Sequence, residues 1–338
     1  MSRMEKQAKK TNAWSNNAIV KAIGTQKLIV LFVIIALFGF FCIKSSAFRQ
    51  YSTVVSIFDY SYYISFMAIG VTFTLITGGV DLSIGTTMIC SGLIGGYLIT
   101  HQGCPVIVGI IVTILVGTAF GILNSILVAV MDIPPFLATL ASMMIARGLG
   151  SIATGGISIT WPQASKPGGW FRSIFKIQSD GTLIPIGFLL VIVVVVVMSI
   201  VLNKTRPGRY IIALGSNKEA TRLSGVNVVK WQSLAYIISG TFAGIAGVAY
   251  AATFQAVAPG TGAGLELDAI AGAIIGGTSM TGGAGSIFGA LLGVFVMSML
   301  KTGLPYIGLQ ANWQQIITGI VLSVAVLIDV IKVIRSRK

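Results

Sequence analysis

The chain has 338 residues, of which 55% are hydrophobic and only 9% are charged. Soluble domains carry roughly 25% charged residues, and a chain this apolar cannot cover its own surface with polar groups. The composition excludes an ordinary cytosolic globular protein, a disordered protein and a disulfide scaffold. The 41 glycines fit packed membrane helices, in which small residues are common. We therefore predict an integral membrane protein with many spans.

The net charge of +14 does not indicate nucleic-acid binding. The basic residues cluster at the edges of apolar runs instead of along one amphipathic face, which is typical of the positive-inside rule for membrane proteins. The three cysteines, Cys42, Cys90 and Cys104, lack CxxC spacing, and His101 is the single histidine. We expect no metal site on this chain.

Ten apolar stretches follow a polar tail at residues 1–27, and each is near the ~20 residues that cross a membrane as a helix. The first lacks a small-residue cleavage site, so we expect a retained helix and not a signal peptide. The predicted fold is an all-α polytopic membrane domain, residues 28–331, in which some helices are broken or Gly-rich. The stretches cover residues 28–43, 52–77, 83–100, 105–131, 136–154, 183–203, 231–254, 265–280, 285–302 and 312–331.

The basic residues predict the orientation. Six lie in residues 1–27, six in 203–230 and four in 332–338. All of them fall on one side if six spans precede the middle segment and four follow it. Both termini, including a basic tail at 332–338, and the 203–230 loop are then cytoplasmic. The 155–182 loop is external, and its Trp161 and Trp170 are expected at the membrane interface.

Small residues recur at the spacing of packed helices. Such GxxxG pairs let helix backbones approach closely, and tight packing with no other role explains most of them. The pairs are Gly92/Gly96, Gly117/Gly121, Gly240/Gly244, Gly272/Gly276, Gly285/Gly289 and Gly289/Gly293. There is also a local echo, because the run TGGVDLSIG at 77–85 resembles TGGAGSIFG at 281–289. Transporters are often built from internal repeats with interrupted helices, but one short match is weak evidence of duplication.

The chemistry that is absent argues against catalysis. The chain has no P-loop, no HExxH and no GxSxG with a triad partner. Its ionisable residues at membrane depth are few and usually face a cavity or a partner there; they are Asp59, Asp81, Arg147, Glu266 and Asp268. Asp81 and Glu266 are expected at turns, where they either cap helix N-termini or serve transport directly.

The 215–227 segment is the most distinctive element of the cytoplasmic loop. Ser216 or Asn217 can cap the N-terminus of a short helix, Glu219 and Arg222 are i,i+3 partners on it, and Gly225 can close it. Two helices can be joined without such an element. It is either a docking helix for a cytoplasmic partner or a solvated connection.

Several separated motifs, in order, resemble the ribose/xylose-type permease subunits of bacterial ABC importers, a binding-protein-dependent transport permease family. The resemblance covers about residues 28–330. It is carried by the run at 77–85, PFLAT at 135–139, ARG at 146–148, GRY at 208–210, ALGSNKEA at 213–220, LELDAIA at 265–271, GGTS at 276–279, GGAGSIFG at 282–289 and the pair Gln314–Gln315.

The resemblance implies the partners. A second permease copy or a related permease shares the pathway, an ATPase with two fused nucleotide-binding domains binds ATP and Mg, and an external protein delivers a monosaccharide. No cofactor and no catalytic residue is expected on this chain, which would lie in the bacterial inner membrane. The segment 213–227 matches the coupling helix that rests on the ATPase, through Ser216, Asn217, Lys218, Glu219, Ala220, Arg222, Leu223 and Gly225.

Two further sets of residues are predicted sites. Polar groups within the spans are candidates for lining the pathway, although each could instead form an interhelical hydrogen bond; they are Thr72, Thr74, Asn124, Gln255 and Asn312. Structural turns are expected at Gly78, Gly79, Asp81, Glu266, Asp268, Gly282 and Gly283. A branched-chain amino acid permease and a stand-alone secondary carrier remain as alternatives.

Overall fold

The computed structural model describes residues 25–179 and 182–336, which are largely helical. Predictions for residues 1–24 and 337–338 lie outside the described residues. The long helices are α3 (Thr25–Lys44), α4 (Tyr51–Ile76), α5 (Ile84–Thr100), α6 (Val106–Ser125), α7 (Pro135–Ala153), α8 (Gly187–Lys204), α11 (Val228–Thr253), α13 (Ile287–Tyr306) and α14 (Ala311–Ser336). The shorter helices are η1 (Ala47–Arg49), η2 (Ile126–Val130), η3 (Gly169–Ile174), α9 (Arg206–Ser216), α10 (Lys218–Leu223) and α12 (Leu265–Ile275).

The predicted all-α polytopic fold is confirmed. Among the described residues, eight helices are long and apolar enough to cross a membrane. The two remaining apolar stretches form α5, with 17 residues, and α12, with 11. At 1.5 Å per residue, α12 is about 16 Å long, roughly half of a ~30 Å hydrocarbon core. α12 is therefore an incomplete span, in line with the prediction that some helices are broken.

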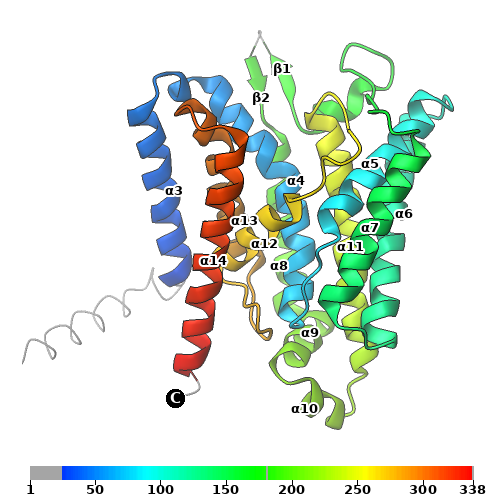
Figure 1. Ribbon diagram of the computed structural model, residues 1–338, viewed down its shortest axis with the longest axis vertical. Coiled ribbons are helices and arrows are strands. Elements are labelled where there is room, and N and C mark those ends of the chain that lie inside the picture. The colour runs from blue at the N-terminus through cyan, green and yellow to red at the C-terminus, as the bar shows by residue number, and fades with distance from the viewer. Residues whose placement is uncertain (1–24, 180–181, 337–338) are drawn as a thin grey trace, which may run out of the picture.

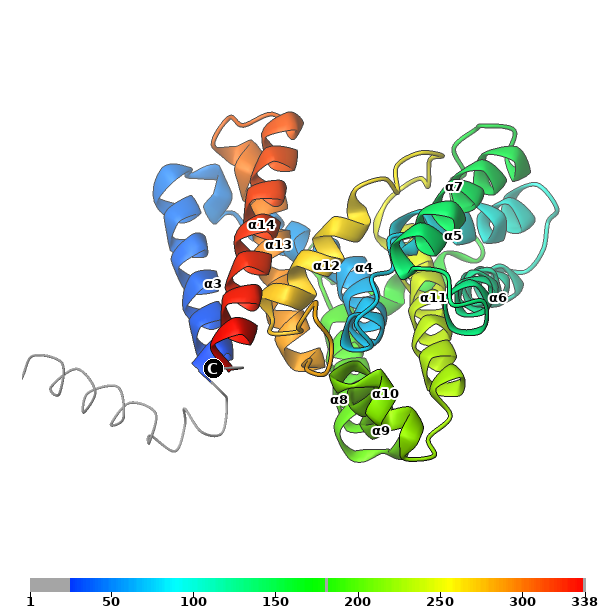
Figure 2. The same ribbon diagram turned by 60° about the horizontal axis from the view of Figure 1, so that its bottom comes forward.

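Two helices form the centre of the bundle. α4 packs against α11, α12 and α13, and α11 also packs against α5 and α6. Figure 2 shows α12 and α4 between a group formed by α3, α13 and α14 and a second group formed by α5, α6 and α7. The most apolar part of α4 is 72% buried, whereas that of α14 is 0% buried. α14 packs on α12 and α13 along one side, and the rest of its surface is open to lipid or to another chain.

The predicted glycine pairs bring helices together in two places. A Cβ on Gly240 of α11 would lie 2.4 Å from the carbonyl oxygen of Gly117 on α6. A Cβ on Gly293 of α13 would lie 2.0 Å from the carbonyl oxygen of Gly272 on α12. Only glycine permits such backbone contact, which maximises van der Waals packing where apolar burial gives no advantage over lipid.

Two glycine-rich segments interrupt the succession of helices. Residues 77–83 join α4 to α5, and residues 276–286 join α12 to α13. Figure 1 shows the first segment rising between α4 and α7 before α5 begins. Irregular backbone at membrane depth is tolerated where protein buries it or where it lines a cavity. The echo between 77–85 and 281–289 thus falls on two interruptions of the helical bundle.

The described part of the 155–182 loop is folded against the helices, which corrects one expectation. Trp161 is not interfacial, because it is 1% exposed and its Nε1 donates to the carbonyl oxygen of Gly92 at 2.9 Å. Trp170 is 52% exposed, and its position at the membrane interface stays a prediction. The loop runs through η3 into a small antiparallel hairpin, β1 (Ile177–Ser179) and β2 (Thr182–Ile184), which was not predicted.

Arg172 holds this loop to the bundle. Its guanidinium donates to the carbonyl oxygens of Pro162 at 2.8 Å, Ala252 at 2.9 Å and Phe254 at 3.2 Å. Burial lowers the pKa of Arg172, but an arginine remains protonated in proteins. The charged guanidinium is therefore hydrogen-bonded to backbone oxygens of both the loop and the end of α11.

Candidate coupling segment and polar sites

α10 has the local structure that the sequence predicts. Asn217 is the N-cap, and its side chain accepts a hydrogen bond from the backbone N–H of Ala220 at 2.9 Å. Arg222 Nη2 lies 2.8 Å from Glu219 Oε1. Gly225 has φ +79° just beyond the helix, the left-handed conformation that closes helices. Ser216, the other cap candidate, instead ends α9 and donates to the carbonyl oxygen of Ile212.

The outer surface of α10 is open. Leu223 is 80% exposed, and the side chains of Glu219 and Arg222 are 63% and 69% exposed. Lys218 contacts Asp132 in the turn between η2 and α7 at 3.1 Å. The open face of α10 thus presents a leucine beside a paired acid and base, and its docking role stays a prediction.

Both glycine-rich turns meet behind this segment. Gly283 N–H donates to the carbonyl oxygen of Ile76 at 2.8 Å. A Cβ on Gly215 of α9 would lie 1.6 Å from that same oxygen, and one on Gly282 would lie 3.0 Å from the nitrogen of Gly78. Gly78, Gly282 and Gly283 have φ values of +82°, +88° and +75°. The end of α9 therefore sits directly on both interruptions.

Asp81 joins three elements at the first turn. One carboxylate oxygen accepts from the N–H and the hydroxyl of Ser83 at 3.0 and 2.6 Å, and the other accepts from the hydroxyl of Ser239 on α11 at 2.7 Å. Asn124 on α6 donates to the hydroxyl of Ser83 at 2.9 Å. Asp81 thus satisfies a backbone N–H at the start of α5, as the capping interpretation expects, and also ties α5 to its neighbours.

The two carboxylates of α12 have different partners. Glu266 accepts from the backbone N–H of Gly264 at 3.0 Å, which satisfies a free donor at the helix start. Asp268 lies inside α12 and not at a structural turn as predicted, and its Oδ2 lies 2.5 Å from Nζ of Lys301 on α13. Lys301 was not singled out from the sequence, because a lysine near the end of an apolar run looks like an interfacial anchor.

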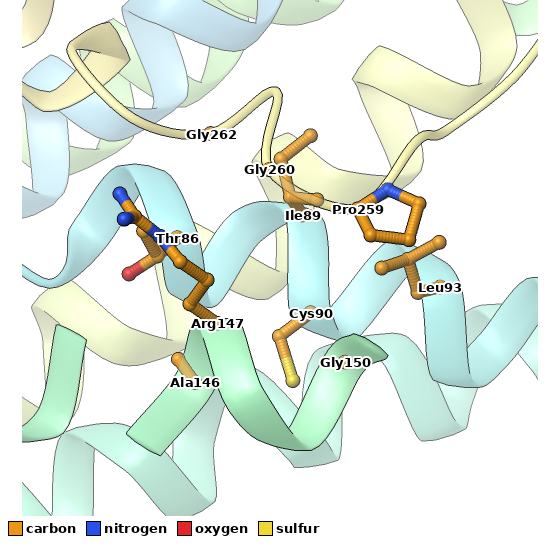
Figure 3. A pocket seen from close by; sticks show the side chains of 10 residues that line it. All are labelled: Thr86, Ile89, Cys90, Leu93, Ala146, Arg147, Gly150, Pro259, Gly260 and Gly262. Carbon is orange, nitrogen blue, oxygen red and sulfur yellow. The ribbon is translucent and has the colours of Figure 1, made fainter. Parts of the chain in front are cut away.

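Arg147, another ionisable residue predicted at membrane depth, lies on α7. It is exposed on α7 and lines a small cavity with Thr86 and the 259–262 loop. Figure 3 shows its side chain reaching toward Thr86 of α5, with Cys90 between the two helices. An arginine on a spanning helix faces a partner or a water-filled space, because lipid would not solvate its charge.

The predicted pathway residues are dispersed in the structure. Thr72 and Thr74 are buried in α4 and donate to carbonyl oxygens of their own helix at 2.6 and 2.9 Å. Asn124 belongs to the Asp81 cluster. Gln255 and Asn312 are exposed, one beyond the end of α11 and one in the first turn of α14. The structure does not bring the five together, and their role in transport stays a prediction.

Comparison with known proteins decides the family. Residues 53–326 match the family described as the permease component of the branched-chain amino acid transport system. The chain belongs to this permease family. No solved structure matches the permease.

Curated relatives cover nearly the whole permease. The fructose import permease protein FruG of Bifidobacterium longum is 32% identical over 91% of this chain and 90% of its own. The ribose import permease protein RbsC of Escherichia coli is 32% identical over 90% and 92%. The galactose/methyl galactoside import permease protein MglC of Haemophilus influenzae is 31% identical over 91% and 95%. These relatives confirm the predicted resemblance to sugar-type permeases over the amino acid alternative.

Proposed function

We propose that this permease forms the transmembrane pathway of an ATP-driven importer for a neutral monosaccharide. The observation that carries the proposal is the agreement of relatives named for fructose, ribose and galactose import along nine-tenths of the chain. The polar side chains within the spans are mainly Thr, Ser, Asn and Gln, which both donate to and accept from hydroxyls. The family description names branched-chain amino acids, so an amino acid is the comparison substrate in the test.

The surface of α10 is the proposed contact with a separate ATPase that has two fused nucleotide-binding domains and binds ATP and Mg. Leu223 and the Glu219–Arg222 pair would rest in a groove of that subunit. When ATP closes the nucleotide-binding domains, α10 moves with them. The close contact of Gly215 with Ile76 and Gly283 supports transmission of that movement to α4 and to the 276–286 segment.

The permease would work with a second copy or a related permease across one pathway, in the bacterial inner membrane. The exposed surface of α14 is consistent with a neighbour in the membrane. Both termini and the 203–230 loop, which holds α9 and α10, would be cytoplasmic. The 155–182 loop would be external and would meet a sugar-binding protein.

Reconstitution tests the proposal. The permease, its ATPase and its binding protein are placed in proteoliposomes, and uptake of labelled ribose, xylose, galactose and leucine is compared with and without ATP. We expect ATP-dependent uptake of at least one sugar and none of leucine. Uptake of leucine alone supports the amino acid alternative, and uptake driven by an ion gradient without the ATPase supports a secondary carrier.

A further inference from the structure

A cavity of about 360 Å³ lies between the start of α12, the second half of α13 and the first turns of α14. Its polar lining comes from Asp268, Lys301, Gln314, Gln315 and Thr318. The volume lies within the range of small-molecule sites, roughly 300–1,000 Å³. Lys301 is five residues before the end of α13, so the site lies about 8 Å below that helix end at 1.5 Å per residue.

The lining of this cavity contains an ion pair, Asp268 with Lys301, inside a membrane domain. The side chains of Lys301 and Asp268 are 23% and 8% exposed, and their atoms are 2.5 Å apart. A buried pair is weak evidence for stability, because apolar residues of similar volume often serve as well. Charges inside a membrane domain are costly and mark functional sites by default. The pair therefore needs an explanation beyond folding.

The ammonium of Lys301 is held from two sides. Asp268 binds it directly, and the ring centre of Tyr60 on α4 lies 5.9 Å from Nζ. Tyr60 in turn packs on Phe254, with ring centres 5.7 Å apart. This arrangement fixes the direction of the charged group before any ligand arrives, which lowers the entropy that binding loses.

The pair also has unused hydrogen-bonding capacity. Among the described residues, Asp268 and Lys301 have only each other as hydrogen-bond partners. An ammonium has three donors and a carboxylate has two acceptor oxygens. Two N–H groups of Lys301 and the second oxygen of Asp268 therefore have no partner in this pair. A hydroxyl group can accept from one and donate to the other at the same time. The amides of Gln314 and Gln315 add further groups of both kinds.

We infer that this cavity is a transient binding site for a neutral polyhydroxyl molecule, a monosaccharide, on its way through the permease. The inference rests on the proposed function and assigns it a place in the chain. The two charges cancel, so an anion would compete with Asp268 and a cation with Lys301. A zwitterionic amino acid would have to separate a pair that is already in contact, whereas a hydroxyl adds to it.

A paired neutral substitution tests the role of the ion pair. The variant Asp268→Asn/Lys301→Gln removes both charges together and leaves no unpaired buried charge, so it should insert and fold. In the complete reconstituted importer we expect sugar uptake to fall about tenfold, since charge-assisted hydrogen bonds are stronger than neutral ones. ATP hydrolysis stimulated by the binding protein should stay within about twofold, because that step does not use the cavity.

The chain offers a matched control. Asp59 and Lys176 form a second Asp–Lys pair, 2.6 Å apart with side chains 16% and 18% exposed, outside this cavity. Asp59→Asn/Lys176→Gln should leave uptake unchanged. If both double variants transport at the wild-type rate, or lose activity equally, the cavity has no special role and the inference is wrong.

Protection of a cysteine gives a second readout. In a chain whose three native cysteines are replaced, Gln314→Cys lies in the cavity and Gln310→Cys lies in the exposed connection before α14. During turnover, ribose, fructose or galactose, whichever the wild type transports, should slow alkylation of position 314 and leave 310 unchanged.

The outcomes separate the two claims. Wild-type transport without protection of position 314 overturns this inference and leaves the proposed function intact. Wild-type proteoliposomes that take up leucine and no sugar overturn the proposed function and this inference with it.

Discussion

The backbone N–H of Gly283 donates to the carbonyl oxygen of Ile76 at 2.8 Å, across more than 200 residues of sequence. This hydrogen bond satisfies an acceptor at the end of α4 that has no partner within the helix. It also joins the two glycine-rich interruptions, and Gly215 of α9 covers it so closely that no side chain fits there. The junction of 76, 215 and 283 is therefore a single packed unit.

Gly283→Ala should damage this junction. The residue has φ +75°, and a Cβ would lie 2.6 Å from Oγ of Ser216. The left-handed conformation alone costs about 1 kcal/mol or more for a residue with a side chain. We expect a lower thermal unfolding midpoint in detergent and loss of most ATP-driven uptake.

Gly319→Ala on α14 is the control, because no heavy atom lies within 4 Å of its added Cβ. Alanine favours helix over glycine by about 1 kcal/mol, so this variant should be neutral or more stable. Equal behaviour of the two variants would show that residue 283 lies in an ordinary loop.

Gly79 makes a contact that a double variant can test. A Cβ there would lie 2.2 Å from the hydroxyl of Tyr236, a buried group without a hydrogen-bond partner among the described residues. Gly79→Ala should therefore lower stability by roughly 1–3 kcal/mol, the usual cost of overpacking. Tyr236→Phe alone should be neutral or stabilising, because it removes an unsatisfied polar atom.

The combination Gly79→Ala/Tyr236→Phe should recover part of the lost stability. Chemical unfolding of all four proteins gives the coupling free energy between the two positions. Simple additivity would mean that the clash is not with the hydroxyl.

The docking role of α10 predicts a separation of activities. Leu223→Asp places a charge at the most exposed apolar position of the segment, and Glu219→Arg breaks the pair with Arg222. Both should weaken binding of the ATPase about tenfold or more, as loss of an interface anchor does. Gly225→Val should act similarly by straining the helix end. Co-purification of the ATPase with each variant measures the effect.

Lys204→Ala is a suitable control for these variants, because Lys204 is exposed at the end of α8 and not on α10. It should bind the ATPase normally. Normal binding and uptake by all of the α10 variants would show that the segment is only a solvated connection.

Arg172 should be indispensable for the 155–182 loop. Arg172→Lys keeps the charge but cannot reach backbone oxygens from three residues with one planar group. We expect a loss of about 2–4 kcal/mol, since several charge-assisted hydrogen bonds are broken. The melting temperature in detergent reports the change. Lys166→Gln in the same loop is exposed and should have no effect; equal melting temperatures would contradict the anchoring role.

Labelling from outside tests the orientation. In a chain without native cysteines, a membrane-impermeant maleimide should label Ala164→Cys in intact cells and should leave Asn217→Cys unlabelled. Permeabilised cells are the control, since both positions should then react. Labelling of position 217 in intact cells would reverse the predicted topology.

The sequence was informative about local structure. Apolar length located ten helices, and the cap at Asn217 and the Glu219–Arg222 pair follow from spacing rules that act within one or two turns. The glycine pairs marked helix faces that can pack closely, but not that Gly117 meets Gly240. The meeting of Gly283 with Ile76 and the pairing of Asp268 with Lys301 could not be predicted. They depend on how distant segments pack, and neither segment alone encodes its partner. The burial of Trp161 was missed as well, because it depends on the fold of its loop, which composition does not reveal.

The fixed position of the 155–182 loop has a consequence for any protein that meets this surface. The hydrogen bonds from Trp161 to Gly92 and from Arg172 to the end of α11 hold the described part of the loop against the helices before a partner arrives. Ordering a flexible loop on binding opposes association, with a cost of about 0.5–1.5 kcal/mol for each side chain that becomes fixed. A protein that docks on this surface would therefore lose little binding free energy to the ordering of the permease.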